Sequence, residues 1–326
     1  MLNLLTHLHA SIPSPTWSYF DLGPLRIHAY ALCILLGIVV ATVWTNRRLV
    51  ARGAENWIVL DVILFAIPIG IVGARIYHVL THPGDYFYEG ADLWRTLYIW
   101  EGGNAIFGSL LGGAVGALIG ARFAGLKFWS FADAVAPGLL VAQALGRLGN
   151  WFNNELFGLP TTLPWGLEIQ PSNPAFPVGL PAGTLFHPTF LYEMIWNLLG
   201  VVAIVVLERR LSLRWGRAFG LYLIWYGVGR SIFETIRIDP SGTLFGVRTN
   251  VWGALIAVLI GIIIIVVQGR RHPGAEESVY LAGRSPAERK DSKPLDSKRA
   301  TESNGKGATV ARKVKSEKSA TSRLKK

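Results

Sequence analysis

The amino-acid sequence predicts an all-α, polytopic membrane protein with seven transmembrane helices. Three observations predict this fold. Of the 326 residues, 51% are hydrophobic and only 16% are charged, whereas soluble domains carry about a quarter charged residues. The 12 tryptophans and 36 glycines are residue types that collect at bilayer interfaces and in packed transmembrane helices. Seven separate apolar runs each approach the length of about 20 residues that crosses a bilayer.

These runs define a membrane domain over residues 1–268, followed by a tail over residues 269–326. The helices are expected at residues 27–46, 57–79, 105–123, 131–147, 188–207, 218–236 and 251–268. The tail is rich in Ser and Lys and nearly free of aromatics, which is typical of a disordered segment. It contains 16 Lys and Arg against 7 Asp and Glu, so it holds most of the net charge of +11. Its lysines either bind anionic lipid or serve only as a topology anchor.

Positive residues alternate between the loops in the way that sets membrane topology. The loops after the first, third, fifth and seventh runs hold Arg47, Arg48, Arg52, Arg122, Lys127, Arg209, Arg210, Arg214, Arg217, Arg270 and Arg271. The other loops hold few positive residues. Because cytoplasmic loops are enriched in Lys and Arg, we expect the amino terminus outside and the carboxyl terminus in the cytoplasm. No positive residue precedes Arg26, so residues 1–25 do not resemble a cleaved signal peptide.

Two further segments have a clear composition. In the third run, glycines recur every four residues, at Gly108, Gly112, Gly116 and Gly120. Such a stripe lets a second helix approach closely, and we interpret it as packing. The longest outer segment, residues 150–187, is rich in Pro and Gly and is expected to be a loop rather than regular structure.

Charged residues within the expected helices lie mostly towards the outer ends. They are Arg75, Arg147, Glu193, Arg230, Glu234 and Arg237. Charges inside a membrane are costly and tend to mark function. Asp61 and Asp133 lie towards the inner side, and we expect them to be local caps or interface residues.

Two of these helices each carry a polar stripe with an arginine at the same depth. The stripes are Gln143, Arg147, Asn150 and Asn154 in the fourth helix and Tyr226, Arg230, Glu234 and Arg237 in the sixth. The fork of an arginine matches phosphate, and a lipid phosphate lies at this depth. Asn and Gln side chains can donate to phosphate or glycerol oxygens. The alternative, snorkelling to the interface, explains Arg75 and Arg237 well, but it explains Arg147 between two glycines poorly.

Several chemistries are disfavoured by what the sequence contains. Cys33 is the single cysteine, and in an apolar helix it is expected to be inert packing. No H-E-x-x-H motif or carboxylate cluster indicates a metal, and no G-x-S-x-G motif indicates a nucleophilic serine. We expect neither a metal nor a cofactor.

Five separate motifs in this sequence resemble those of a known family. The stretch "GRLGNWFNNELFG" at residues 146–158 is similar to the signature of bacterial prolipoprotein diacylglyceryl transferases. Four further motifs occur in the family's order: "LGPLRIHAYAL", "WEGGNAIFG", "HPTFLYE" and "YGVGRSIFETIR". The resemblance covers about residues 22–268 and leaves the tail out.

The resemblance implies an enzyme of the bacterial cytoplasmic membrane with its active site towards the extracytoplasmic side. Its partners would be phosphatidylglycerol, the lipobox cysteine in the signal peptide of a prolipoprotein, and the bilayer, with no nucleic acid. The diacylglyceryl group would pass to the cysteine thiol as a thioether, and glycerol phosphate would leave.

The resemblance also implies roles for individual residues. Arg147 and Arg230 would hold the phosphate, and Tyr30 would orient the headgroup. The other expected site residues are Asn150, Asn153, Glu155 and Gly158 of the signature, Gln143, and Glu234 and Arg237 as supports of Arg230. His187 either belongs to the site or caps the start of the fifth helix.

One position departs from the family pattern. Many members have a histidine in the third-helix motif, proposed as the base that deprotonates the thiol, where this sequence has Phe107. The other candidates for a base are His28, His187 and Glu155. Our hypothesis is that arginine electrostatics suffice, because a thiol of pKa about 8.5 needs little help to ionise near neutral pH.

Two other classes of function fit the sequence less well. An anion or lipid transporter would need polar residues along the inner halves of the helices, where Asp61 and Asp133 stand nearly alone. A membrane scaffold without chemistry would leave the two arginine stripes unexplained.

Overall fold

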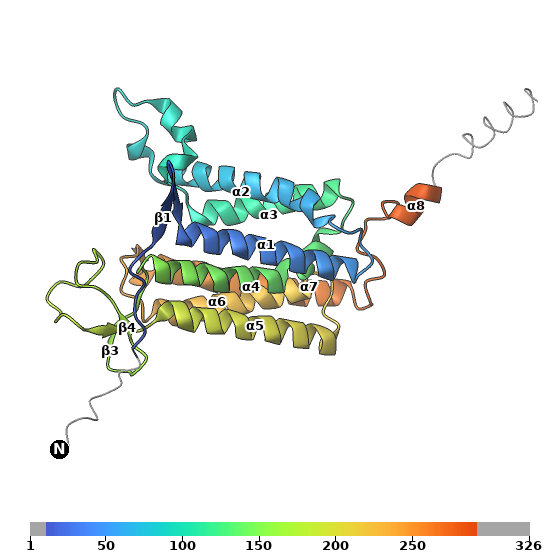
Figure 1. Ribbon diagram of the computed structural model, residues 1–326. Helices are drawn as coiled ribbons and strands as arrows, with labels where there is room; N and C mark the ends of the chain where they lie inside the picture. Colours follow the sequence, from blue (N-terminus) through green and yellow to red (C-terminus); the bar gives the residue numbers. More distant parts are fainter. Residues whose placement is uncertain (1–10, 292–326) are drawn as a thin grey trace, which may run out of the picture. The chain divides into compact units, whose positions relative to one another are not determined.

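The computed structural model describes residues 11–291 and consists mostly of helices. Seven long helices run side by side (Figure 1). They are α1 (Ala29–Val50), α2 (Val59–Thr81), α3 (Ile106–Phe123), α4 (Phe128–Phe152), α5 (Thr189–Leu211), α6 (Arg217–Glu234) and α7 (Thr249–Arg271). Each lies where the apolar runs predict it, and no end is shifted by more than five residues.

Within residues 11–291, six of these helices are long and apolar enough to cross a membrane. The polytopic helical class is therefore supported. The exception is α6, whose 18 residues include Arg217, Arg230 and Glu234. The charges that lower its apolar character are largely those of the predicted site.

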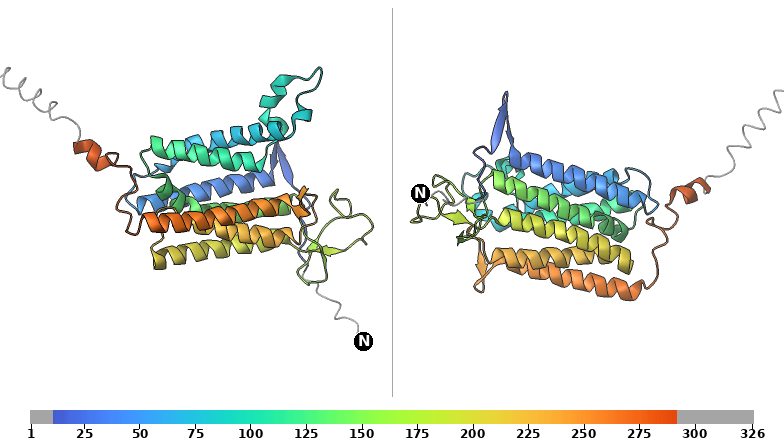
Figure 2. Two further views of the ribbon diagram at one scale, coloured as in Figure 1. Left: turned by 180° about the vertical axis from the view of Figure 1, so that it is seen from behind. Right: turned by 60° about the horizontal axis from the view of Figure 1, so that its bottom comes forward.

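The short elements gather at one end of the bundle, which we call the sheet end (Figures 1 and 2). It comprises the hairpin β1 (Tyr19–Leu22) and β2 (Leu25–His28), the 3-10 helices η1 (Pro83–Asp85), η2 (Leu93–Leu97) and η3 (Ile99–Glu101), the sheet β3 (Pro160–Thr161), β5 (Leu185–Phe186) and β4 (Leu167–Glu168), and the hairpin β6 (Thr243–Leu244) and β7 (Val247–Arg248). All these pairings are antiparallel. The expected loop at residues 150–187 thus contains only three two-residue strands.

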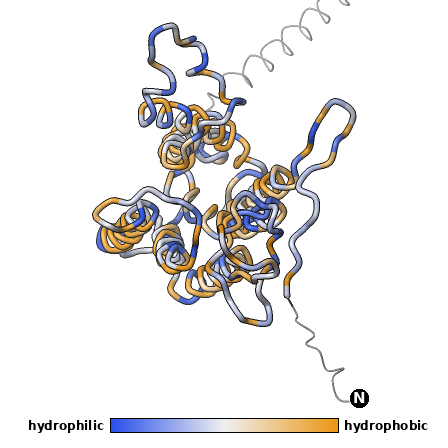
Figure 3. Tube along the Cα trace, turned by 90° about the vertical axis from the view of Figure 1, so that its left-hand side faces the viewer, coloured by the Kyte–Doolittle hydropathy of each residue, from blue (hydrophilic) through white to orange (hydrophobic). Residues whose placement is uncertain are grey.

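The helices pack mainly in pairs, α2 with α3, α1 with α4, and α6 with α7. The glycine stripe of α3 explains the first pair. A Cβ on Gly112 would lie 2.5 Å from the carbonyl oxygen of Ile69, and one on Gly116 would lie 2.6 Å from that of Phe65. The packing interpretation of this stripe is confirmed. Seen from the sheet end, the helices are largely hydrophobic (Figure 3), and side chains such as Leu64 and Leu111 are 71% and 66% exposed.

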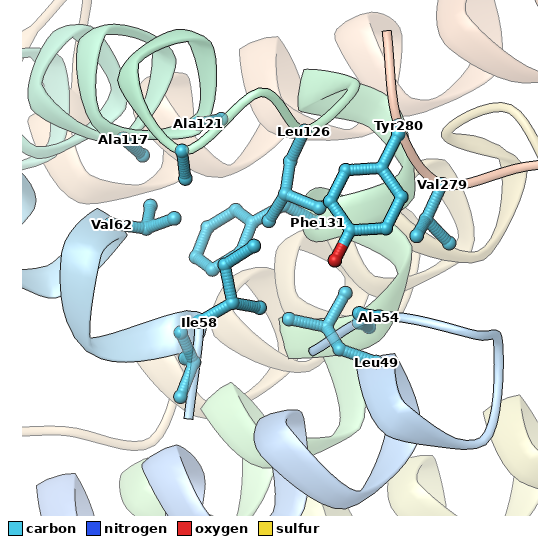
Figure 4. Close-up of a cluster of buried hydrophobic side chains, with 13 residues drawn as sticks. Leu49, Ala54, Ile58, Val62, Ala117, Ala121, Leu126, Phe131, Val279 and Tyr280 are labelled. Atoms are coloured by element: carbon cyan, nitrogen blue, oxygen red, sulfur yellow. The ribbon is translucent and has the colours of Figure 1, made fainter. Parts of the chain in front are cut away.

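We call the other end of the bundle the basic end, because its loops hold arginines such as Arg47, Arg122 and Arg209. There a buried apolar cluster joins α1, α2, α3 and α4 (Figure 4). Val279 and Tyr280 belong to it, with 3% and 4% of their surface exposed. The Lys127 amide donates to the carbonyl oxygen of Val279 at 2.8 Å, and the Glu55 amide donates to the Tyr280 hydroxyl at 2.8 Å. The segment just after α7 is thus anchored to the bundle.

This anchoring differs from the tail boundary that composition predicts. The compact unit that holds the helices runs to Tyr280, not to residue 268. Two apolar residues in a polar stretch are too few to alter its composition, so their burial is not visible in the sequence. A second unit begins at Leu281 and contains the short helix α8 (Pro286–Asp291). Residues 292–326 of the predicted disordered tail lie outside the described residues.

The basic end also holds the two polar groups that organise its turns. Asp133 accepts hydrogen bonds from the amides of Gly216 at 2.8 Å and Phe219 at 3.0 Å, so it caps the start of α6. The cap prediction for Asp133 is therefore confirmed. Nearby, the buried carboxylate of Glu208 forms ion pairs with Arg48, Arg52 and Arg214.

Candidate functional site

A small pocket near the sheet end brings together the two arginines of the predicted stripes. Arg147 comes from α4 and Arg230 from α6, and both line one pocket. The other lining residues are Gln143, Glu193, Trp196, Asn197, Tyr226, Gly229 and Phe233. Helices α4, α5 and α6 therefore supply all of its walls.

Each arginine has a carboxylate partner. Arg147 Nη2 lies 2.5 Å from Glu193 Oε2 of α5. Arg230 Nη2 lies 2.9 Å from Glu234 Oε2, the i, i+4 pairing that the sixth-helix stripe predicts. The side chains of Arg147 and Arg230 are 20% and 14% exposed. Both charges are thus nearly withdrawn from solvent, so an anion in the pocket would interact with them strongly.

Arg147 is held by the polar residues that follow it in the signature. It donates to Asn150 Oδ1 at 3.2 Å, and Asn150 donates in turn to Glu155 Oε1 at 2.8 Å. Asn153 donates to the same oxygen at 3.3 Å. Asn150, Asn153 and Glu155 therefore orient Arg147 and do not line the pocket themselves.

Asn154 does not continue the fourth-helix stripe. The helix ends at Phe152, and Asn154 and Leu156 have φ values of 53° and 59°, in the left-handed region. The Asn154 amide therefore points away from the stripe and donates to the carbonyl oxygen of Pro15 at 3.0 Å. The chain must turn sharply here to place Glu155 against Asn150.

Gly158 and His187 lie at a junction between backbones. The Gly158 amide donates to the carbonyl oxygen of His187 at 2.9 Å, and a Cβ on Gly158 would lie 2.9 Å from the carbonyl oxygen of Ile236. The ring Nδ1 of His187 lies 3.2 Å from the Tyr192 hydroxyl. The side chain of His187 does not cap α5, whose first flanking residue is Pro188. Both residues connect backbone segments beside the site and do not line the pocket.

Tyr30 also lies beside the site rather than in it. It stands in the first turn of α1, and a Cβ on Gly149 would lie 2.5 Å from its ring. The glycine between Arg147 and Asn150 thus allows α1 and α4 to approach closely. Tyr30 is 36% exposed and is absent from the lining of the pocket.

Glu234 is the most deeply buried acid of the site, with no exposed side-chain surface. Besides Arg230, its carboxylate lies 2.9 Å from Arg248 Nε and accepts from Asn250 Nδ2 at 2.9 Å. Neither Arg248 nor Asn250 is among the site residues expected from the sequence. Both flank the start of α7, so only the fold brings them to Glu234.

Snorkelling to the interface, the alternative explanation for Arg75 and Arg237, is not supported for either residue. They are 5% and 7% exposed. Arg237 pairs with Asp239 at 2.6 Å. Arg75 donates to the carbonyl oxygens of Thr96 at 2.8 Å and Gly102 at 2.6 Å, so it fastens the loop between α2 and α3. Each arginine finds local acceptors in the loops at the sheet end, which snorkelling does not require.

The pairing of Asp239 is reflected in its acidity. Burial alone would raise the pKa of Asp239, but the hydrogen bonds and the charge of Arg237 outweigh burial and lower the pKa below its usual value. Asp239 is therefore ionised at neutral pH and neutralises Arg237. Arg237 reaches Asp239 and makes no direct ion pair with Glu234 within residues 11–291.

None of the residues considered as a base lines the pocket. The ring of Phe107 faces α7, where a Cβ on Gly253 would lie 2.9 Å from it. His28 ends β2, and its ring centre lies 5.7 Å from that of Tyr19. Glu155 reaches the pocket only through Asn150 and Arg147.

Six lining residues were not among the expected site residues. Glu193 was recognised as a charge within a helix, but its partner could not be named. Tyr226 belongs to the sixth-helix stripe but was given no role, and the others are Trp196, Asn197, Gly229 and Phe233. A helical spacing could have found Asn197, because it follows Glu193 by one turn on the same face.

Together, these features define a polytopic membrane protein with a pocket lined by two arginines and enclosed by helices. The sequence profile of the prolipoprotein diacylglyceryl transferase family matches residues 18–267. The chain belongs to this family, which confirms the resemblance seen in its motifs.

Named relatives agree over most of the chain. A phosphatidylglycerol–prolipoprotein diacylglyceryl transferase of Leifsonia xyli subsp. xyli is 61% identical, over 84% of this chain and 86% of its own. A protein of Streptomyces coelicolor with the same name and the number 2 is 45% identical, over 94% and 96%. One of Bifidobacterium longum is 48% identical, over 79% and 85%.

Proposed function

We propose that this protein transfers the diacylglyceryl group of phosphatidylglycerol to a prolipoprotein, the first step of lipoprotein maturation. The acceptor is the thiol of the lipobox cysteine, the product is a thioether, and glycerol phosphate leaves. The observation that carries the proposal is the convergence of Arg147 and Arg230 on one pocket among apolar helices. A phospholipid has a phosphate for the arginines and acyl chains for the surrounding apolar surface.

The proposed orientation places the sheet end on the extracytoplasmic side of a bacterial cytoplasmic membrane. Seven spans, including α6, then leave the amino terminus outside and the carboxyl terminus in the cytoplasm. Arg47, Arg122 and Arg209 are exposed at the basic end and support this orientation. The phosphate of an outer-leaflet lipid would lie at the depth of Arg147 and Arg230.

The proposed chemistry is a displacement at the glycerol carbon that bears the phosphate. The thiolate sulfur forms a bond to this carbon, the carbon–oxygen bond breaks, and its electron pair stays on the phosphate oxygen. The guanidinium groups of Arg147 and Arg230 stabilise the charge that grows on the leaving phosphate. Glu193 and Glu234 hold the two arginines in place before the lipid binds.

Residues around the pocket support the two arginines. Asn150, Asn153 and Glu155 fix the position of Arg147 through hydrogen bonds. Tyr30 supports the same turn of α4 from α1. Their proposed contribution is to hold the donors in the geometry that the transition state needs, where small displacements are costly.

A transporter remains the second class to test, and one observation counts against it. A path through the bundle would need free polar groups towards the basic end. Both buried acids there are already paired. Asp133 accepts from the amides of Gly216 and Phe219, and Glu208 forms ion pairs with three arginines.

The direct test uses purified protein in micelles that contain phosphatidylglycerol, with a synthetic lipobox peptide. We expect the peptide to gain the mass of one diacylglyceryl group and an equal amount of glycerol phosphate to be released. The same peptide with serine in place of the cysteine is the control and should gain nothing. Folded protein that binds the lipid but leaves the cysteine peptide unmodified would contradict the proposal.

A separate prediction concerns the missing histidine. If the arginines alone lower the barrier enough, replacing His28 or His187 by alanine changes kcat less than about threefold, and kcat rises with pH as the peptide thiol ionises around its pKa of about 8.5. The measurement is a pH profile of kcat at saturating lipid for wild type, His28→Ala and His187→Ala. A collapse of kcat in either variant at neutral pH, with recovery at high pH, would identify that histidine as the base.

A further inference from the structure

The pocket has a second polar layer one helical turn below the charged one. Measured from the sheet end, the charged layer consists of Arg147 on α4, Glu193 on α5 and Arg230 on α6. Four residues deeper on each helix stand Gln143, Asn197 and Tyr226, which also line the pocket. Four residues of α-helix rise about 6 Å. Three helices of alternating direction thus place three uncharged polar side chains at one depth.

The side-chain amide of Gln143 has one atom with a hydrogen-bond partner and one atom without. Its Nε2 donates to the hydroxyl of Tyr222 at 3.0 Å, while its Oε1 is buried and has no hydrogen-bond partner among residues 11–291. A half turn of the amide exchanges the two ends. The Tyr222 hydroxyl then donates to Oε1, and the NH₂ group faces the pocket with both its hydrogens free for an acceptor.

Asn197 lines the pocket from the facing helix. It is only 6% exposed, and no hydrogen bond joins its side-chain amide to the rest of residues 11–291. Unlike Gln143 Oε1, its amide atoms are not completely buried, so a ligand group can still reach them and accept a hydrogen bond. Below these residues the helices meet in an apolar cluster that includes Leu140, Val201 and Ile204, so the polar surface ends at this depth.

The identity of the missing partner follows from what lies just below a lipid phosphate. Going inwards from the phosphate, a diacyl phospholipid offers two ester carbonyl oxygens, which accept hydrogen bonds and carry no charge, and then hydrocarbon. Neutral amides that can donate suit such carbonyls, and a second charged layer would not. The order of charged, neutral and apolar layers in the pocket matches the order of groups along the lipid.

We propose that Gln143 and Asn197 bind the ester carbonyl oxygens of the diacylglyceryl group and thereby set the depth at which the lipid sits. Tyr222 is a positioning residue that orients the Gln143 amide. This inference rests on the proposed transfer function and names the substrate group that the inner layer recognises. It makes the pocket selective for ester-linked over ether-linked lipids.

The test compares phosphatidylglycerol with its dialkyl ether analogue, which keeps the phosphate and the reacting carbon but lacks both ester carbonyls. For each variant the ratio of kcat/KM for the ester lipid over the ether lipid is measured. We expect about a tenfold preference for the ester in wild type, reduced severalfold in Gln143→Leu and in Asn197→Leu. Because both lipids are given to the same preparation, a reduced folded fraction cancels in the ratio.

The matched control is Gln268→Leu. Gln268 is also a buried glutamine with an unpartnered Oε1, but it lies near the end of α7 at the basic end. Its substitution should leave the ester-to-ether ratio at the wild-type value. The proposal is supported if the ratio falls in Gln143→Leu or in Asn197→Leu while Gln268→Leu keeps the wild-type ratio. An unchanged ratio in both Gln143→Leu and Asn197→Leu overturns it.

The ratio of lipid binding, measured by competition between the two lipids for the purified protein, gives the same comparison without turnover. A wild type that binds the ester lipid preferentially but transfers nothing would contradict the proposed function and not the assignment of the inner layer. Equal binding of both lipids by wild type would overturn the assignment, whatever the transfer rate.

Discussion

Replacing Arg147 with alanine is expected to lower kcat/KM for diacylglyceryl transfer by about a thousandfold. Removing one preorganised donor to a developing oxyanion costs two to three orders of magnitude, and Arg147 offers a full charge in a site where its side chain is only 20% exposed. Arg230→Ala should have an effect of the same order. The measurement is the initial rate of peptide modification against lipid concentration, corrected for the folded fraction.

A matched control separates the loss of a catalytic charge from the loss of a buried ion pair. Arg52 is similarly buried, with a side chain 9% exposed, and pairs with Glu208 at the basic end. Arg48 and Arg214 also contact Glu208, so Arg52→Ala leaves that carboxylate compensated. We expect Arg52→Ala to keep kcat/KM within about threefold of wild type. If Arg147→Ala were no slower than Arg52→Ala, the phosphate role of Arg147 would be excluded.

The second large effect is expected at Glu234. Its fully buried carboxylate lies 2.9 Å from both Arg230 and Arg248. Glu234→Ala leaves the Arg230 guanidinium without its carboxylate and Arg248 with only its pair to Asp239, and breaking a buried pair in this way costs about 3–5 kcal/mol. The variant should therefore lose thermal stability in detergent and, in the fraction that stays folded, transfer at least about tenfold more slowly, because Arg230 loses its orientation.

Two further variants test the reason for this effect. Glu234→Gln keeps the shape and the acceptor for Asn250 but not the charge, so its stability should fall between wild type and Glu234→Ala. Glu101→Ala removes an acid whose pair with Arg95 is exposed at the sheet end, and its stability should hardly change. A Glu234→Ala protein as stable as Glu101→Ala would show that the carboxylate of Glu234 does not hold the two arginines.

Much of the site could be predicted from the sequence because its key residues are close together along helices. Arg147 and Asn150, or Arg230 and Glu234, are three and four residues apart, and helical periodicity places such residues on one face. That both arginines would face the same ligand also follows from their common depth. The lining of the pocket by Arg147 and Arg230 agrees with this reasoning.

What could not be predicted are the partners that come from other parts of the chain. Glu193 reaches Arg147 from another helix, and Arg248 reaches Glu234 from the second strand of a hairpin. Arg75 and Arg237 have the sequence context of snorkelling residues, but loops fold over them and supply carbonyl oxygens or a carboxylate. Hydropathy describes where a residue lies across the membrane and not which loop covers it.

The sequence by itself determined the helical membrane class, the approximate ends of seven helices, the family and the two arginines, because hydropathy, helical period and the signature are all local patterns. Only the tertiary structure decided that Val279 and Tyr280 anchor the start of the tail, and that Gln143 and Asn197 share a layer beneath the arginines. These arrangements depend on how separate helices rotate and pack against one another. That rotation is set by many weak contacts distant in sequence, which no single segment records.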